Sequence, residues 1–393
     1  MSPVPILTIA ELEADPHGVF RHHRASTPVI ATERGITIVL RSVDVERLMR
    51  DSSLLASGTR LVEMQGVTGG ALFDMFHYGM LTANGAEHRR RRSPFTRSFA
   101  AGMISALRPA IRASATRLID EWHGEVDLVE QYAAELPARV ISTILGLPEA
   151  DIPRFTALVY SVSRIISFTF PPDQLAQIET DGCELYDYVD AVLQRRRERP
   201  RDDLLSAYLA NAAAKGELSP VEIVVQIVIL IAGGTDTTRV AIASQVSLLL
   251  QHREQWDAVR ADPSLTHQAV AEAIRFEPSV GSVGRQLAQD VKIGDIPVAA
   301  GSFLILSTMS ASRDEAVHAR PDTFDIHRTD QRRLHPVFGG GAHRCLGEAL
   351  AWAELEEGLT VLAARRPHLR LAGPPPPVRG HMGIRRIGAM LVT

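Results

Sequence analysis

The chain is poor in cysteine, in net charge and in long apolar runs, and each shortage excludes a class of protein. Two cysteines among 393 residues, Cys183 and Cys345, cannot form a disulfide framework, which favours a reducing cytoplasm. A net charge of −4 gives no reason to expect nucleic acid as a partner. The most apolar run, residues 223–232, is about half of the ~20 residues that a membrane span needs. The N-terminus has no signal-peptide pattern, so we expect a cytoplasmic protein without a membrane anchor.

Helical periodicity dominates the rest of the chain. Three segments place apolar side chains on one helical face, namely 103–123, 246–262 and 346–366. Between 284 and 308 the pattern changes to strand-like runs around Gly294-Asp295, which predicts a hairpin. The prolines at 374–377 precede what we expect to be a short terminal strand pair. Length alone would allow two or three domains, but no linker is visible. We therefore predict one mostly α-helical domain with a small β part, spanning residues 1–393.

The stretch HPVFGGGAHRCLG, residues 335–347, puts Cys345 behind three glycines and beside His343 and Arg344. The commonest meaning of a lone cysteine is a small buried side chain, here at a glycine turn that leads into a helix. A phosphate-binding loop would need a glycine where Arg344 stands. Structural zinc would need four ligands, and the sequence has no CxxC pair. What is left is a single thiolate at a helix N-terminus, where the dipole and free amides stabilise it, and such a ligand suits haem iron.

The spacing of this stretch resembles the haem-binding signature of the cytochrome P-450 family. The matching positions are Phe338, Gly339, Gly341, His343, Cys345, Gly347, Leu350 and Ala351. The resemblance implies a single-domain cytochrome P-450 fold, with haem b as the cofactor and Cys345 as the axial ligand of its iron. It also implies that Gly347 lets the chain pass close to the macrocycle and that Phe338 covers the sulfur.

A second motif, AGGTDTT, lies in the long apolar segment. The positions that match the family's oxygen-binding helix are Gly233, Gly234, Asp236 and Thr237. The resemblance implies that Gly234 thins the helix beside the iron, that Thr237 hydrogen-bonds the oxygen being activated, and that Asp236 relays protons. We expect Thr235 and Thr238 on other faces of the helix. Without the cysteine motif, these residues would indicate a kinked helix whose hydroxyls bond its own carbonyls.

A third motif pairs Glu272 with Arg275 at E-x-x-R spacing, which puts both side chains on one helical face. Alone, such a pair is usually a surface salt bridge worth under ~1 kcal/mol. Here it resembles the family's buried pair, whose third member matches Arg328. The implied role is structural, holding the loop on the haem side.

The resemblance also supplies four cations for the two haem propionates, His88, Arg92, Arg285 and His343. Buried propionates need paired donors, and His88 and Arg92 share a helical face at i, i+4. The neighbouring 89–91 arginines indicate a basic surface patch, which together with Arg344 would offer a docking face to an acidic partner.

Two positions depart from the family pattern. Val283 stands where some members have an acidic residue near a propionate, and Ser312 stands where many have Asn. Neither touches the chemistry.

The resemblance places a mostly apolar substrate pocket on the distal side, which predicts a mostly hydrophobic substrate. Each phenylalanine in this set is almost as well explained as ordinary core. The expected pocket residues are Phe73, Phe76, Phe168, Phe170, Ile229, Ala232, Val280, Gly281, Met382 and Ile384.

The sequence therefore predicts a bacterial-type haem-thiolate monooxygenase that uses O2 to hydroxylate or epoxidise a mostly apolar small organic molecule. No flavin or iron–sulfur motif is visible, so a separate ferredoxin and its NAD(P)H-dependent reductase would supply the electrons. Two alternatives stay open. One is a peroxide-driven peroxygenase, although such members lack the acid–alcohol pair found here. The other is a non-enzymatic haem-based gas sensor, for which no output module is visible.

Overall fold

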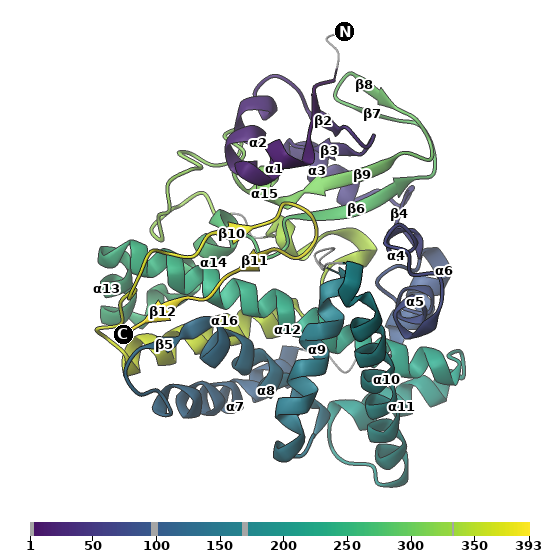
Figure 1. Cartoon of the computed structure of the whole chain (residues 1–393), viewed down its shortest axis with the longest axis vertical. Helices are drawn as coiled ribbons and strands as arrows, with labels where there is room; N and C mark the ends of the chain where they lie inside the picture. The colour runs from purple at the N-terminus through teal and green to yellow at the C-terminus, as the bar shows by residue number, and fades with distance from the viewer. Residues whose placement is uncertain (1–3, 96–100, 167–171, 332–333) are drawn as a thin grey trace.

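The computed structural model describes residues 4–95, 101–166, 172–331 and 334–393. Figure 1 shows a small β part with the first helices at one end of the molecule and most of the helices at the other. The helices are α1 (Ile9–Ala14), α2 (Pro16–Arg24), α3 (Ser42–Arg50), α4 (Arg60–Glu63), α5 (Gly70–His77), α6 (Gly85–Arg92), α7 (Ala101–Asp120), α8 (Glu135–Leu145), α9 (Ile152–Ile166), α10 (Leu175–Glu198), α11 (Leu204–Lys215), α12 (Pro220–Gln251), α13 (Arg253–Ala261), α14 (Thr266–Phe276), α15 (Thr308–Ser312) and α16 (Glu348–Arg365). The strands are β1 (Ile6–Leu7), β2 (Val29–Thr32), β3 (Thr37–Val39), β4 (Leu54–Leu55), β5 (Val126–Asp127), β6 (Ser282–Leu287), β7 (Val291–Ile293), β8 (Ile296–Val298), β9 (Phe303–Ser307), β10 (Val378–Arg379), β11 (Arg386–Ile387) and β12 (Leu391–Val392).

Six strands form one sheet in the order β1-β2-β3-β9-β6-β4. β3 runs parallel to β9, and β6 runs antiparallel to it, so that Arg285 lies opposite Leu304. Leu12 and Phe20 of the first two helices pack with Ile38 and Ile305 of the sheet in a small core of their own. This packing fixes the position of the sheet, and strand β6 of the sheet carries Arg285, which lines the cavity described below.

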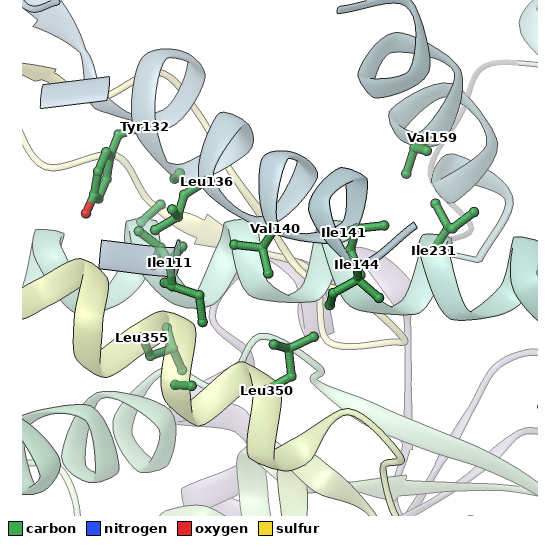
Figure 2. Packing of buried hydrophobic residues seen from close by; sticks show 14 of the residues in the cluster. Ile111, Tyr132, Leu136, Val140, Ile141, Ile144, Val159, Ile231, Leu350 and Leu355 are labelled. Atoms are coloured by element: carbon green, nitrogen blue, oxygen red, sulfur yellow. The ribbon is translucent and has the colours of Figure 1, made fainter. Parts of the chain in front are cut away.

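Helix α12 is the central element of the main core. Ser219 and Glu222 form a capping box at its start, with Pro220 in the first turn, where its missing N–H costs nothing. Figure 2 shows buried side chains of α8 and α16, such as Ile141 and Leu350, packed around this helix. By length and composition alone α12 could cross a membrane, but 72% of its most apolar window is buried inside the protein. That burial is typical of a core helix.

The prediction of a mostly helical chain with a small β part is confirmed. β7 and β8 form the hairpin expected around Gly294-Asp295, with Ile293 opposite Ile296 and Gly294 at φ 57°. The strand pair expected after the proline run is also present, since Val378 of β10 pairs with Ile387 of β11.

Candidate active site

A cavity of about 290 Å³ lies between α12, the start of α16, α6 and β6. Its wall is mostly apolar, but one side carries a cysteine and a group of basic side chains. The lining residues used below are Met80, Leu81, His88, Arg92, Ile141, Ile229, Leu230, Gly233, Gly234, Thr237, Thr238, Ala241, Ile274, Ser279, Val280, Val283, Arg285, Phe338, His343, Cys345, Gly347, Leu350, Ala351, Glu354 and Leu355. The cavity therefore brings together residues of the cysteine loop, the oxygen-helix motif and the predicted propionate cations, with two of the expected pocket residues.

Cys345 lies in this wall, three residues before α16 begins at Glu348. Its backbone N–H donates to the carbonyl of Phe338 at 2.8 Å, which closes the glycine-rich loop around it. Burial raises the pKa of the Cys345 thiol, and the hydrogen bond from the Gly347 amide offsets this only in part. A buried thiol of this kind loses its proton and becomes a thiolate when a metal ion binds its sulfur.

Two glycines leave the wall open. A Cβ added at Gly347 or Gly233 would meet no atom within 4 Å, although both residues line the cavity. At Gly341, by contrast, a Cβ would lie 3.0 Å from the Met49 carbonyl, and its φ is +60°, so this glycine serves the turn and its packing on α3. The open space beside Gly347 and Gly233 can receive a large flat group.

Four basic side chains, His88, Arg92, Arg285 and His343, meet on the same wall. The His88 and His343 rings lie 4.1 Å apart between centroids. Arg92 and Arg285 donate only to the carbonyls of Arg344 and Gly284, at 2.7 and 2.8 Å, and no ion pair is found for either among the described residues.

Burial weakens the charged form of every member of this cluster, and repulsion by neighbouring cations adds to this effect for the two histidines. Burial lowers the pKa of Arg285 to about 10 and also lowers the pKa of Arg92. Burial, together with the neighbouring arginines, lowers the pKa of His88 to about 4 and that of His343 to about 3. Uncompensated buried cations are costly, so the cluster fits a ligand with two carboxylates, and the adjacent thiol fits a metal. Haem b has both features.

Comparison with known proteins gives the same result. The family model for cytochrome P450 matches residues 154–363. The plant-inducible cytochrome P450-pinF1 of Rhizobium radiobacter is 40% identical over 98% of this chain and 91% of its own. The chain belongs to the cytochrome P450 family.

Other relatives of this P450 are bacterial enzymes. Luteothin monooxygenase of Streptomyces thioluteus is 31% identical, with coverage of 86% of this chain and 83% of its own. The mycinamicin IV hydroxylase/epoxidase of Micromonospora griseorubida is 33% identical, with coverage of 79% and 78%. The crystal structure of CalO2 superposes with a TM-score of 0.89 at 28% identity, over 98% of this chain and 96% of that one. The protein thus has the P450 fold, is a monooxygenase-type enzyme and carries cysteine-ligated haem b.

The oxygen-helix motif is only partly directed at the P450 cavity. Gly233, Gly234 and Thr237 line it, and Thr237 donates its hydroxyl proton to the Gly233 carbonyl at 2.7 Å. Asp236 is buried outside the lining, where its Oδ1 accepts from Arg239 Nε and Nη2 at 2.9 and 2.6 Å. The acid and the alcohol of the motif therefore lie on different sides of α12.

The expectation that Thr235 and Thr238 point elsewhere holds for one of them. Thr235 is buried and donates to the Ile231 carbonyl, away from the lining. Thr238 is a correction, because it lines the same cavity as Thr237, where its hydroxyl donates to the Gly234 carbonyl at 3.2 Å and lies close enough to Glu354 to influence its pKa. Successive helical residues are only about 100° apart, so a wide cavity contacts both.

Glu354 is the site residue that sequence reasoning missed. It lines the cavity from α16, is 1% exposed, and its Oε1 has no partner among the described residues. Burial raises the pKa of this carboxyl well above its usual range, and the nearby Thr238 hydroxyl offsets this only in part. Helical spacing could have identified Glu354, because it follows Gly347 by two helical turns and therefore lies on the same face of the helix.

The E-x-x-R motif forms a buried cluster away from the cavity wall. Arg275 Nε and Nη2 each donate to Glu272 at 2.7 Å, and Arg328 Nε donates to Glu272 at 3.1 Å. Gln331 and the backbone N–H of Asp325 bind the same carboxylate, at 2.7 and 2.9 Å. One carboxylate thus ties α14 to the loop that precedes the Cys345 region.

Two of the residues expected in the substrate pocket line this cavity. Ile229 and Val280 line the cavity, whereas Phe73, Phe76, Ala232, Gly281, Met382 and Ile384 do not, and Phe168 and Phe170 lie outside the described residues. The phenylalanines of α5 face inward, because Phe76 joins the main core and Phe73 stacks on His77 at 5.7 Å. A Cβ on Gly281 would lie 2.8 Å from the His381 carbonyl, so that position only packs two segments together. The wall is instead formed by Met80 and Leu81, which follow α5.

Proposed function

We propose that this P450 oxygenates a mostly apolar small molecule, with Cys345 as the axial ligand of its haem. The observation that carries the proposal is the position of Cys345 in a cavity wall that also holds four basic side chains without a carboxylate partner. Haem, when bound, supplies the activation of O2 that a haem-thiolate monooxygenase requires. The protein's own residues bind, orient and move protons.

In this proposal His88, Arg92, Arg285 and His343 hold the two haem carboxylates. Contact with those carboxylates would favour the charged forms of residues whose pKa values burial now lowers. Gly233, Gly234 and Gly347 provide room for the flat ring, and Phe338 covers the cysteine side. Glu272, Arg275 and Arg328 keep the supporting loop in place.

Protons reach the reacting oxygen from α12. Thr237 presents its hydroxyl to the cavity and exchanges protons there, while Asp236 collects protons from the side where Arg239 holds its carboxylate. Glu354 is a second acid at the cavity wall, and burial raises its pKa, which favours its protonated form. We therefore assign Glu354 a supporting role in proton supply.

The distal wall supports an apolar substrate. Ile141, Ile229, Leu230, Ala241 and Val280 offer no charge to a ligand. Such walls discriminate by shape and by burial of apolar surface. Hydroxylation and epoxidation are the reactions that fit, as they are in the name of the Micromonospora relative.

A ferredoxin-type protein is the proposed electron donor, and a surface near Cys345 supports this. Of the predicted arginines, Arg90 and Arg91 are only 24% and 11% exposed, and both bind the buried Glu222, at 2.5 and 3.0 Å. The proposed face keeps the predicted Arg344 and adds Arg50, Arg108 and Arg112, which flank the glycine-rich loop and α16.

This arginine face presents positive charge because its counter-charges are buried more deeply. The Arg112 side chain is 60% exposed and its partner Glu357 is 7% exposed, and Arg50 and Glu46 differ in the same direction. An acidic one-electron carrier complements such a face. An NAD(P)H-dependent reductase would regenerate the carrier.

The proposal also includes one domain over residues 1–393 and a cytoplasmic location.

The experiment that tests the proposal replaces each cysteine. Cys345→Ala should lose the strongly red-shifted Soret band of the reduced carbon monoxide complex, because no thiolate is left to bind the iron. Cys183→Ala should keep the band, since Cys183 lies on α10 and does not line the cavity. Retention of the band in Cys345→Ala, with loss in Cys183→Ala, would overturn the assignment.

A further inference from the structure

Residues 77–80, here called the 77–80 segment, connect the end of α5 to the cavity wall formed by Met80 and Leu81. Two side chains from other helices hold its backbone. Gln226 Oε1 accepts from the Met80 N–H, and Gln226 Nε2 donates to the Tyr78 carbonyl, both at 2.8 Å. Arg91 Nη1 donates to the carbonyls of His77 and Gly79, at 3.0 and 3.3 Å.

These two side chains are themselves buried and fully engaged. Gln226 is 0% exposed and also donates to the Glu222 carbonyl at 2.9 Å, while the Glu222 carboxylate binds Arg91 Nε at 3.0 Å. A buried amide is costly unless every polar atom has a partner. The segment therefore cannot leave α12 without exposing Gln226 to an apolar environment with unmet hydrogen bonds.

The packing of the segment on α12 is equally close. A Cβ at Gly79 would lie 2.1 Å from Ile229 Cδ1 and 2.3 Å from the Met75 carbonyl, so only glycine fits there. Ile229 lies one helical turn beyond Gln226, packs against Gly79 of the segment, and lines the cavity as Met80 and Leu81 do. The spacing between the segment and Ile229 is thus set by the Gln226 hydrogen bonds and by direct contact.

We infer that Gln226 and Arg91 are positioning residues for substrate specificity, because they fix the position of the cavity wall that Ile229, Met80 and Leu81 line. The inference rests on the proposed function, since it assumes that this cavity receives the substrate. A wall held by four hydrogen bonds admits molecules of one width and excludes wider ones. A wall that is released adapts to wider molecules and selects less.

The test compares Gln226→Leu with Gln245→Leu in the haem-loaded protein. Gln245 is a matched control, because it is buried on the same helix, donates to the Leu355 carbonyl at 3.3 Å, and lies outside the cavity lining. The first readout is amide hydrogen exchange in a peptide that contains Met80. The second is the dissociation constant, from the haem absorbance shift, of two probes of different width, imidazole and 1-tritylimidazole.

Gln226→Leu should speed exchange at Met80 and tighten 1-tritylimidazole binding by about tenfold relative to imidazole, the size of effect expected when one buried hydrogen-bonding group no longer restrains the wall. Gln245→Leu should change neither. Should Gln226→Leu fail to fold, Gln226→Glu serves instead, because its carboxylate still accepts from Met80 N–H but cannot donate to the Tyr78 carbonyl. Faster exchange with an unchanged ratio of the two constants overturns the specificity role, and unchanged exchange overturns the restraint itself. Failure of the wild-type protein to shift with imidazole would count against the proposed function instead.

Discussion

Three polar side chains of α12 and α16, Thr237, Thr238 and Glu354, line the cavity in addition to its cysteine and its four basic side chains. Burial raises the pKa of Glu354, so the folded protein holds its proton at a pH where a free glutamate has lost it. A protonated carboxyl can donate a proton, and it loses this ability as pH rises through the raised pKa of Glu354. The Thr237 hydroxyl, by contrast, does not titrate, and it donates to a backbone carbonyl.

Thr237→Ala should therefore separate oxygen consumption from product formation. Haem and the apolar wall stay intact, so the variant should bind substrate and consume NADH. It should release most of the electrons as hydrogen peroxide, because positioned proton transfer is typically worth ~10²–10⁴-fold. Glu354→Gln should slow turnover at neutral pH and remove the alkaline fall in rate that deprotonation of Glu354 causes. Product per NADH oxidised, peroxide released and a pH profile measure all three effects.

Thr235→Val is the control for this experiment, since Thr235 is buried away from the cavity and bonds only the Ile231 carbonyl among the described residues. Its coupling should match the wild-type value. Thr238 is no longer a neutral comparison, because it lies close enough to Glu354 to influence its pKa. If Thr238→Ala uncouples and Thr237→Ala does not, the active alcohol is one residue further along the helix than proposed.

At the scale of elements, one carboxylate joins α14 to the loop before the Cys345 region. Glu272 is fully buried and receives hydrogen bonds from Arg275, Arg328, Gln331 and the Asp325 backbone. Removing its charge leaves two arginines without their shared counter-charge in an apolar setting. The loss of one partner of a buried ion pair typically costs about 3–5 kcal/mol.

Glu272→Gln should accordingly lower the free energy of unfolding by about 3–5 kcal/mol and reduce haem retention, because the loop it supports leads to Cys345. Glu254→Gln, at an exposed position on the neighbouring helix α13, should stay within about 0.5 kcal/mol of wild type. Urea titration with haem absorbance as the signal measures both quantities. Equal stability of the two variants would show that Glu272 does not hold this loop.

The elements differ in how far the sequence predicts them. The β7–β8 hairpin and α12 follow from local signals, a Gly-Asp turn and a capping box with proline, which act within a few residues. The haem-side residues follow from motif spacing, and the structure gathers them in one wall. The substrate side does not follow, because whether Phe76 faces the core or the cavity depends on how α5 packs against distant helices. Asp236 likewise faces Arg239 rather than the cavity, a choice set by a neighbour and not by the motif.

At the scale of the whole molecule, the net charge of −4 conceals a local positive surface. In the arginine face around α16, the Arg108 and Arg112 guanidinium groups are more exposed than the Glu357 carboxylate that they bind. Fields of this kind act over about one Debye length, ~8 Å at physiological ionic strength. They therefore guide a partner that approaches closely and lose strength in salt.

Arg112→Ala is the sharpest test of this face, because Arg108 remains on Glu357 at 2.9 Å and no buried charge is left without a partner. With an acidic [2Fe–2S] ferredoxin as the probe, we expect the dissociation constant to rise roughly two- to fivefold at low salt, the size of one exposed charge pair. The difference should disappear at high salt, where screening removes the contribution of Arg112. Arg154→Ala is the control, since Arg154 is equally exposed and paired with a glutamate, Glu184, but lies on α9. Stopped-flow reduction and titration at two salt concentrations measure the effect. Equal weakening by both variants would mean that only total charge matters, and no weakening by Arg112→Ala would place the electron donor on another face.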